Sequence, residues 1–369
     1  MRLGSCGKIL MDNKKFWRNK KVFVTGHTGF KGAWLAFVLK NFGAEFKGYS
    51  LQPPTSTNLF DLIGIDKEIN SVIGDVRNLE KLQREFKIFQ PEIVFHLAAQ
   101  PIVLEGYKNP VETYSTNVMG TVNILECIRQ NESVRSFVNV TTDKVYYNNE
   151  WCYSYRETDE LNGIDPYSNS KSCSELVTQC YSRSFFSARE VAISTARAGN
   201  VIGGGDFAEF RIIPDCVRAA LEGKVIEVRN PNSIRPYQHV LEPLFAYIMI
   251  AAAQFDDKNF AGSYNVGPSE NDNVTTGELA EIFCRSWGEN LRWESKALNQ
   301  PKEANFLKLD CSKIKSVFDW QPRWNITTAV EKSVEWYKIY RDGGDVVNCM
   351  ENQVENFLED SNDATRKAR

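Results

Sequence analysis

Histidine is scarce in this sequence, which has three in 369 residues, and the three stand far apart along the chain. Zinc centres take several histidine or cysteine ligands held close together, so we expect no metal site. The nine cysteines form no Cys-x-x-Cys pair, and an odd number without that spacing is typical of reduced thiols rather than of a disulfide framework. Reduced thiols favour a cytoplasmic protein.

Long apolar runs and an excess of basic residues are also absent. No apolar stretch reaches the length needed to cross a membrane, so the sequence predicts no membrane-spanning segment. The net charge is −3, which argues against a surface that binds nucleic acid. Any phosphate group must therefore be bound by individual arginine or lysine side chains. The chain contains no internal repeat and no low-complexity segment.

A glycine loop near the N-terminus is the first feature that indicates a function. Residues 21–26 (KVFVTG) are rich in β-branched and aromatic residues, as expected of a buried parallel strand. Gly26, Gly29 and Gly32 follow one another at intervals of three, and the apolar segment 33–39 predicts a helix. A strand, a glycine turn and a helix form a dinucleotide-binding unit, in which backbone N–H groups hold a pyrophosphate. The alternative is an ordinary turn that tolerates glycine.

Tyr167 and Lys171 are the second feature. Their spacing of four residues places both side chains on one face of a helix, one turn apart. A lysine ammonium beside a phenol stabilises the phenolate and lowers the tyrosine pKa, which makes the phenol a general base for an alcohol proton. Many surface helices carry this spacing by chance, so the pair gains its meaning from the glycine loop upstream.

Strand-like and helix-like segments alternate through the first half of the chain, which predicts an α/β fold with a doubly wound parallel sheet of the Rossmann type. We expect strands at 21–26, 45–50, 71–75, 93–98, 136–142 and 191–195, and helices at 111–130 and 167–187. Beyond residue 205, prolines break this rhythm. The predicted organisation is a flexible leader (1–15), a dinucleotide-binding Rossmann domain (16–205), a smaller, mainly substrate-binding domain whose strands return to the main sheet (206–345), and a C-terminal helix or tail (346–369).

Several motifs in this order resemble the extended short-chain dehydrogenase/reductase family. They are the glycine loop, Leu97-Ala-Ala99 after a predicted strand, Asn117, Thr141-Thr-Asp-Lys144, and Tyr167-x-x-x-Lys171. Within that family the chain is similar to the nucleotide-sugar 4,6-dehydratases of the cytidine type. The similarity rests on the stretches 26–32 (GHTGFKG), 199–206 (GNVIGGGD) and 235–243 (RPYQHVLEP), and the resemblance as a whole covers roughly residues 15–340.

The resemblance implies NAD as the cofactor and identifies the residues that bind it. They are Gly26, Thr28, Gly29, Phe30, Lys31, Gly32, Ser50, Asp75, Val76, Leu97, Ala98, Ala99, Gln100, Thr116, Thr141, Tyr167 and Lys171. The ribose position departs from the usual pattern, because Ser50 stands where an Asp or Glu is expected about 20 residues after the glycine loop. A serine can hydrogen-bond a ribose hydroxyl but cannot repel a 2′-phosphate. The residues alone therefore leave NAD and NADP open.

The same resemblance implies oxidation of a hexose at C4, loss of water across C5 and C6, and return of the hydride to C6. Tyr167 is then the base for the 4-hydroxyl proton, Lys171 its activator and ribose anchor, and Thr142 a hydroxyl donor to the sugar oxygen. The resemblance assigns Asp143 as the acid for the departing hydroxyl. Lys144 stands where the thymidine-type relatives carry a glutamate base for C5, and an amine acts as a base only when burial or positive neighbours lower its pKa.

Substrate contacts follow from the resemblance as well. The guanidinium groups of Arg211 and Arg235 are expected to bind the diphosphate through paired hydrogen bonds. Further polar contacts to phosphate or sugar are expected at Gln100, Thr142, Asn200, Asn265 and Asn305. The implied substrate is CDP-glucose, the implied product CDP-4-keto-6-deoxyglucose, and the implied setting the synthesis of deoxysugars for lipopolysaccharide O-antigen. The hydrogen-bonding residues themselves do not identify the base.

Two other functions fit the same motifs. A nucleotide-sugar 4-epimerase or reductase of this fold uses the Tyr/Lys pair but needs no acid for a leaving hydroxyl, so Asp143 favours the dehydratase. A non-catalytic NAD-binding sensor belongs to another class of protein. Such a sensor need not retain Thr142, Tyr167 and Lys171, so their presence favours an enzyme.

A homodimer or larger even oligomer is also implied by the resemblance. In this family two helices of each subunit pack against their mates across a two-fold axis. The helices expected at 111–130 and 167–187 are the candidates, and they carry apolar residues beyond what one core needs. These residues include Val118, Val122, Leu176 and Val177.

Overall fold

A computed structural model describes residues 14–296 and 306–367 of the chain. Its central feature is a parallel sheet of seven strands in the order β11-β6-β5-β4-β1-β2-β3. The strands are β1 (Lys21–Thr25), β2 (Glu45–Ser50), β3 (Asn70–Ile73), β4 (Ile93–His96), β5 (Ser136–Thr142), β6 (Ala192–Ala198) and β11 (Ser263–Val266). The strand order reverses between β1 and β4, which is the switch point of a doubly wound sheet. The predicted Rossmann-type sheet is confirmed, and β11 is the strand that returns to it from beyond residue 205.

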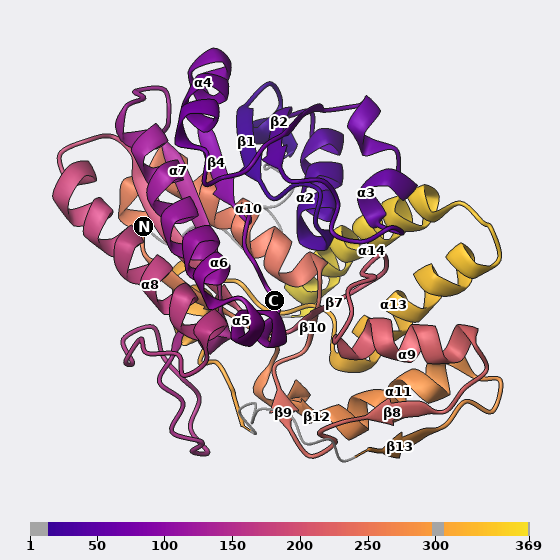
Figure 1. The fold of residues 1–369 in the computed structure, drawn as a ribbon. Coiled ribbons are helices and arrows are strands. Elements are labelled where there is room, and N and C mark those ends of the chain that lie inside the picture. Colours follow the sequence, from indigo (N-terminus) through magenta and orange to yellow (C-terminus); the bar gives the residue numbers. More distant parts are fainter. Residues whose placement is uncertain (1–13, 297–305, 368–369) are drawn as a thin grey trace.

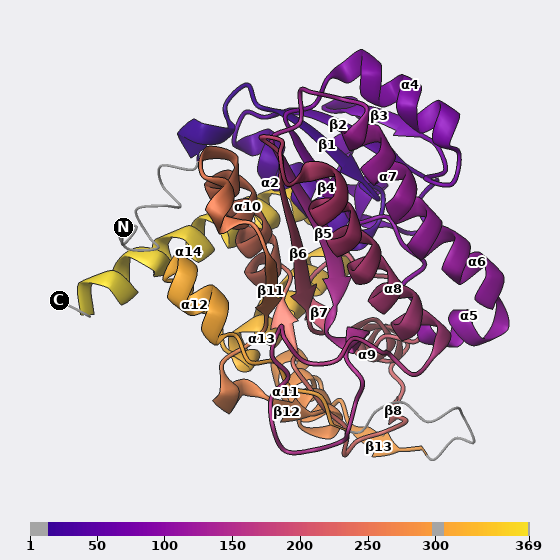
Figure 2. The same cartoon turned by 90° about the vertical axis from the view of Figure 1, so that its left-hand side faces the viewer.

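Helices cover both faces of this sheet. Figure 2 shows α4 (Leu79–Phe89), α7 (Gly120–Arg129) and α8 (Pro166–Tyr181) on one face, and α2 (Phe30–Asn41) and α10 (Leu241–Asp256) on the other. Two separate hydrophobic cores fill the two interfaces. In α2 every residue from Gly32 to Leu39 is buried, because further chain packs on the side that does not face the sheet. A helix buried on all sides is apolar on all sides, which explains its unbroken apolar sequence.

The helices expected at 111–130 and 167–187 are both present, each with a π-helical turn, and both lie on the α4 face. The first is built from α6 (Pro110–Tyr114), a π-helical segment at Ser115–Met119 and α7. The second, α8, begins at Pro166 and continues into a π-helical segment at Ser182–Phe186. Asp165 caps α8, since its side chain accepts a hydrogen bond from the Ser168 N–H at 3.0 Å, and Pro166 occupies the first helical position. This cap fixes where the helix that carries Tyr167 starts.

A smaller lobe lies beyond the carboxyl ends of the strands (Figure 1). It contains α9 (Ile212–Leu221), β8 (Ile226–Val228), β9 (Ile234–Arg235), β12 (Val274–Thr275), α11 (Thr276–Trp287) and β13 (Trp293–Ser295). In it β8 pairs with β13, and β9 pairs with β12. The remaining elements are α3 (Leu59–Leu62), α5 (Val103–Lys108), β7 (Val201–Ile202), β10 (Gln238–His239), α12 (Ser312–Phe318), α13 (Ile326–Arg341) and α14 (Val346–Lys367), with 3-10 turns at Ile65–Lys67, Asp143–Val145, Lys258–Phe260 and Glu270–Asp272.

Both ends of the described chain are helical. Residues 14–17 form a helical turn, although residues 14 and 15 fall in the expected leader. At the other end α14 continues to Lys367. Among the helices that the structure describes, none combines the length and the apolar character that a membrane crossing requires.

Candidate active site

A cavity of about 820 Å³ runs along the carboxyl edge of the sheet and continues beneath the smaller lobe. Most of the residues expected from the sequence lie on its wall. These are Gly26, Thr28, Gly29, Phe30, Lys31, Gly32, Ser50, Asp75, Val76, Leu97, Ala98, Ala99, Thr116, Thr141, Thr142, Asp143, Lys144, Tyr167, Asn200, Arg211 and Arg235. The sheet brings them together because the carboxyl ends of β1, β2, β4 and β5 meet at one edge.

The glycine loop forms the wall of the cavity at the start of α2. Gly26 has φ +79°, and a Cβ atom there would lie 2.6 Å from the Ala98 nitrogen. A Cβ atom at Gly32 would lie 2.0 Å from the Gly26 oxygen. A side chain at Gly26 would therefore push the loop away from the chain that follows β4, and one at Gly32 would push α2 away from the loop. Gly29 precedes α2 without a side-chain cap, which leaves the first N–H groups of the helix available to an anion. The loop therefore fits the pyrophosphate of a dinucleotide.

The end of the cavity beyond this loop fits the adenosine half of a dinucleotide. The Ser50 hydroxyl lies 2.9 Å from the Thr28 hydroxyl, and both residues are on the cavity wall. Asp75 follows β3, and the hydrogen bonds that Arg77 donates to its carboxylate lower the Asp75 pKa. No arginine or lysine occurs from residue 50 to residue 55, so that segment offers no positive partner for a 2′-phosphate.

Gln100 does not reach the cavity, although it was expected to contact both ligands. Its side-chain N–H donates to Thr113 at 2.8 Å, and its side-chain oxygen accepts from the Ile102 N–H at 2.6 Å. Its backbone N–H donates to the Asn117 side chain. The residue therefore shapes the loop after β4 and is not on the cavity wall.

Tyr167 lies on the cavity wall, and Lys171 lies one turn further along α8, buried behind it. Burial raises the pKa of Tyr167 to about 12, although a hydrogen bond with the Thr142 hydroxyl acts to lower it. The Lys171 ammonium donates to the Val140 carbonyl at 3.2 Å. It is thus tied to β5 and not to the phenol, which differs from the expectation that Lys171 lowers the pKa of Tyr167. Burial lowers the pKa of Lys171 itself to about 7.

Asp143 is a buried carboxyl whose pKa is shifted toward that of a proton donor. Its side chain is 1% exposed, and this burial raises its pKa. The Thr142 hydroxyl donates to Asp143 Oδ1 at 2.9 Å, whereas Asp143 Oδ2 has no hydrogen-bond partner among the residues that the structure describes. A protonated carboxyl with a free oxygen can donate to a hydroxyl in the cavity. Lys144 is next to it on the wall, half-buried, and its backbone N–H donates to Thr142.

Two further cations lie near this centre. Burial and the charge of Arg211 lower the Lys31 pKa to about 8, although the charges of Asp143 and Asp206 act to raise it. Arg211 forms an ion pair with Asp206 at 2.8 Å. The sequence placed Lys31 with the cofactor and Arg211 with the diphosphate. In the structure Lys31 lies close enough to Asp143 for their charges to interact, and the charge of Arg211 acts on Tyr167.

Of the remaining residues that were predicted to contact the substrate, some line the cavity and others do not. Arg235 and Asn200 line the cavity, and the charge of Arg235 acts on Asp143. Asn265 is fully buried, and its amide donates to the backbone oxygens of Tyr155 and Asp310. The Tyr146 hydroxyl donates to its oxygen. All of its side-chain polar atoms are therefore used within the protein, and it is not on the wall. Asn305 falls outside the described residues.

Sequence reasoning missed much of the wall that the smaller lobe supplies. The missed residues include Phe210, Asp215, Glu227, Arg229, Asn230, Tyr237 and Thr276. They come from short, proline-interrupted segments in which no periodicity marks a buried face. Asp206, which lines the cavity and pairs with Arg211, could have been predicted, because it ends the stretch 199–206 on which the family resemblance rests.

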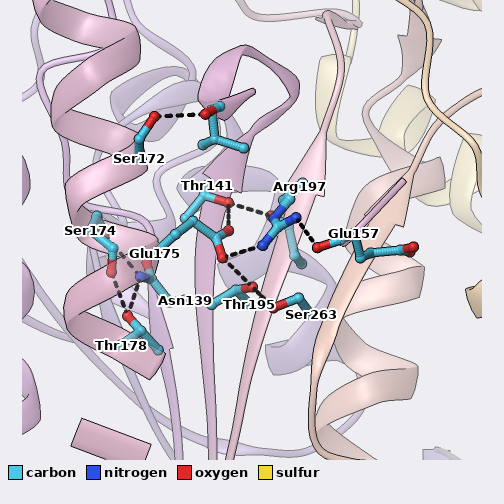
Figure 3. Close-up of polar contacts among 12 residues, drawn as sticks. Asn139, Thr141, Glu157, Ser172, Ser174, Glu175, Thr178, Thr195, Arg197 and Ser263 are labelled. Atoms are coloured by element: carbon cyan, nitrogen blue, oxygen red, sulfur yellow. Dashed lines mark hydrogen bonds and ion pairs between the residues drawn. The ribbon is translucent and has the colours of Figure 1, made fainter. Parts of the chain in front are cut away.

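A buried ion pair lies behind the site, between α8 and β6. Figure 3 shows the Glu175 carboxylate facing the Arg197 guanidinium, with Thr141 and Thr195 beside them. The two charged groups are 2.9 Å apart and neither side chain is exposed. Thr141 and Thr195 both donate to the carboxylate, the latter at 2.8 Å. Since Thr141 precedes Thr142 and Glu175 lies one turn beyond Lys171, the pair fixes the strand and the helix of the reaction centre against each other.

The groups at the centre of the site are the side chains of Thr142, Asp143, Lys144 and Tyr167. Across residues 14–296 and 306–367, no group of three or more histidine, cysteine, aspartate or glutamate side chains is arranged to hold a metal ion. The uncapped start of α2, the close-packed glycine loop and the carboxylate of Asp75 together fit a dinucleotide such as NAD. The second half of the cavity then remains for a second ligand, which meets Tyr167 and Asp143.

Comparison with known proteins places this site among nucleotide-sugar enzymes. Residues 23–333 match the family described as GDP-mannose 4,6 dehydratase. A CDP-glucose 4,6-dehydratase from Salmonella typhimurium is 44% identical over 354 residues, which are 94% of this chain and 99% of that protein. A CDP-paratose 2-epimerase from Salmonella typhi is 24% identical over 86% of this chain and 98% of its own length.

Solved structures share the fold. The dTDP-glucose 4,6-dehydratase of Bacillus anthracis, in complex with NAD, has a TM-score of 0.73 at 23% identity, over 89% of this chain and 99% of that one. The UDP-glucose 4-epimerase of Thermotoga maritima, with UDP-glucose, has a TM-score of 0.75 at 20% identity, over 86% of this chain and 99% of that one.

Proposed function

This chain belongs to the GDP-mannose 4,6-dehydratase family, and on that premise we propose that it converts CDP-glucose into CDP-4-keto-6-deoxyglucose and water. It is a nucleotide-sugar 4,6-dehydratase, a hydro-lyase that uses NAD. The observation that carries this function is the buried Asp143 carboxyl close to Tyr167, because sugar oxidation alone needs no such acid. The cytidine substrate is supported by the 44% identity to the Salmonella typhimurium enzyme over nearly the whole of both chains.

Bound NAD would supply the hydride chemistry, oxidation at C4 and reduction at C6, so that the reaction would have no net redox change. The glycine loop, Ser50 and Asp75 would hold it. The chain's own residues move the protons. Tyr167 takes the proton of the 4-hydroxyl, with the Thr142 hydroxyl holding the phenol oxygen in place. Lys171, buried behind Tyr167, donates a hydrogen bond to the Val140 carbonyl of β5.

The loss of water requires an acid and a base on the oxidised sugar. The 4-ketone acidifies the hydrogen at C5, and Lys144 is the proposed base for it because its side chain lies on the cavity wall beside Asp143. Asp143 gives its proton to the departing 6-hydroxyl through the oxygen that has no partner within the described part of the protein. Lys144 can return the proton that it took to C5 when the hydride arrives at C6.

The proposed reaction is tested by incubating the purified protein and NAD with CDP-, UDP-, dTDP- and GDP-glucose in separate reactions. We expect conversion of CDP-glucose into a product lighter by the mass of one water, detected by mass spectrometry. A product of unchanged mass would instead identify a 4-epimerase, and a product lighter by two hydrogens, formed together with reduced cofactor, would identify a reductase acting in reverse. Binding of NAD without any turnover would instead favour the non-catalytic NAD-binding sensor.

We also propose that the chain forms a homodimer through α7 and α8. Leu176 on α8 is 50% exposed, and Met119 at the start of α7 is also 50% exposed. Val118 and Val122 are half-buried, whereas Val177 packs against the core beneath α8. Apolar side chains exposed on two adjacent helices favour a contact with a second copy.

A Leu176→Arg variant is expected to convert the dimer into a monomer, because it places two charges at a two-fold contact that buries apolar surface. Light scattering at micromolar concentration measures the mass. The matched control is Ile88→Arg, since Ile88 on α4 is 69% exposed but lies outside the proposed contact. A monomeric parent protein would refute the proposal, as would a Leu176→Arg protein that remains dimeric.

The cellular setting follows from the product. A 4-keto-6-deoxyhexose linked to CDP is a precursor of deoxysugars, so we propose a role in their synthesis for lipopolysaccharide O-antigen. A cytoplasmic location is supported by the cysteines, because all eight in the described residues are free thiols.

A further inference from the structure

The end of the cavity that the smaller lobe covers carries a carboxylate and a guanidinium, which have opposite hydrogen-bonding character. Asp215 lies in the first turn of α9, and Arg229 directly follows β8. Both are on the cavity wall, with their side chains 30% and 27% exposed. Asp215 Oδ2 lies 3.4 Å from Arg229 Nη2. The Arg229 guanidinium also lies over the Phe210 ring, 5.6 Å from its centroid.

This pair is held in position from the protein side. Arg218, one turn further along α9, forms an ion pair with Asp215. The same guanidinium donates to the backbone oxygens of Phe207 at 3.3 Å and Ala208 at 3.4 Å. Arg218 therefore anchors the carboxylate to the loop that precedes α9. A polar group that is fixed before a ligand arrives loses little freedom when the ligand binds.

The position of this pair matches the nucleoside of the substrate, an argument that rests on the proposed function. The glycine loop and Asp75 occupy the cofactor end of the cavity, and the hexose must meet Tyr167 and Asp143 in the middle. The diphosphate and the nucleoside of a nucleotide sugar must then extend toward the remaining end. Asp215, Arg229 and Phe210 line that end, and the last offers an aromatic surface to a planar base.

Hydrogen-bonding rules decide which base fits the pair. A carboxylate only accepts hydrogen bonds and a guanidinium only donates them. Cytosine presents an amino donor at N4 beside an acceptor at N3, whereas uracil and thymine present an acceptor at O4 beside a donor at N3. We propose that Asp215 accepts from the cytosine amino group while Arg229 donates to N3, and that this pair selects cytosine over uracil. Uracil would place oxygen against carboxylate and N–H against guanidinium.

The proposal predicts a loss of base selectivity on substitution of the acid. Asp215→Asn introduces an amide that can turn either its oxygen to cytosine or its N–H groups to uracil O4. We expect the ratio of kcat/KM for CDP-glucose to kcat/KM for UDP-glucose to fall by about tenfold or more. The matched control is Glu227→Gln, because Glu227 lines the same end of the cavity but its carboxylate is bound by Lys296 at 2.6 Å. Its ratio should stay at the parent value.

Arg229→Gln provides a second variant on a different element, and it should lower the same ratio. A merely structural pair would lower kcat/KM for both substrates equally and leave the ratio unchanged, which would overturn the proposal. A fall in the ratio for Glu227→Gln with none for Asp215→Asn would overturn it as well and assign the base to Glu227. Thermal unfolding of each variant establishes that it folds.

Titration calorimetry with CDP and UDP separates this inference from the proposed function, because it needs no turnover. We expect the parent to bind CDP more tightly than UDP and Asp215→Asn to reduce that difference. If the parent protein shows this preference but does not dehydrate CDP-glucose, only the proposed function is refuted. A parent that dehydrates CDP-glucose while Asp215→Asn retains the full CDP preference would sink only the role of the pair.

Discussion

A Tyr167→Phe variant is expected to lose dehydratase activity by about 10²–10⁴-fold, since general base catalysis contributes factors of that size. The substitution removes the phenol oxygen that takes the 4-hydroxyl proton, so the first oxidation fails. No reduced nicotinamide should then appear when substrate is added. Absorbance of the reduced cofactor in a single-turnover mixture measures this step, and mass spectrometry measures the dehydrated product.

Tyr114→Phe is the matched control for this loss. Tyr114 lies on α6, and its hydroxyl donates to Asn169 on α8 at 2.8 Å, outside the cavity wall. This variant loses the same atom from the neighbourhood of the same helix, and we expect activity near that of the parent. Full activity of Tyr167→Phe would show that another group removes the proton.

The second large effect is expected for Asp143→Asn, which should slow formation of the dehydrated product by about a hundredfold or more. The amide keeps the shape of the side chain and a hydrogen-bond donor, but it has no proton to give to the leaving hydroxyl. Oxidation at C4 does not need that proton. Reduced nicotinamide should therefore accumulate in this variant, in contrast to Tyr167→Phe, and should decay slowly.

The matched control is Asp165→Asn, the same substitution at the start of α8. Asparagine caps helices as well as aspartate does, and Asp165 is not on the cavity wall, so activity should remain near the parent value. Turnover of Asp143→Asn at the parent rate would remove Asp143 as the acid. The dehydratase would then need another group for the departing hydroxyl.

The sheet could be predicted because its central strands β1 and β4 are short, mostly apolar and buried. The strands β1, β2, β4 and β5 all begin at the expected residues. The glycine loop was recognisable because close packing at Gly26 and Gly32 excludes side chains. Tyr167 was expected on a helix from its spacing with Lys171, and in the structure Asp165 and Pro166 start that helix.

The direction in which a polar side chain points could not be predicted. Gln100 and Asn265 occupy strand ends near the cavity, yet the first folds back on its own loop and the second is bound by Tyr146 and two backbone oxygens. Their residue types suit a ligand or an internal contact equally well. Asp215 and Arg229 were missed for a related reason, because only the packing of the smaller lobe brings α9 and the end of β8 together.

The ion pair of Glu175 and Arg197 also has a consequence for how the protein is made. The ribosome completes α8 before β6, so the nascent chain carries the Glu175 carboxylate before its arginine exists. An uncompensated charge in that position costs about 3–5 kcal/mol, which opposes docking of α8 on the sheet. The reaction centre is therefore completed late in synthesis, after the strand with Arg197 has emerged. A fragment made of the first 191 residues would contain the glycine loop, Asp143 and Tyr167. It would lack Arg197, the residue that pairs with Glu175 behind them.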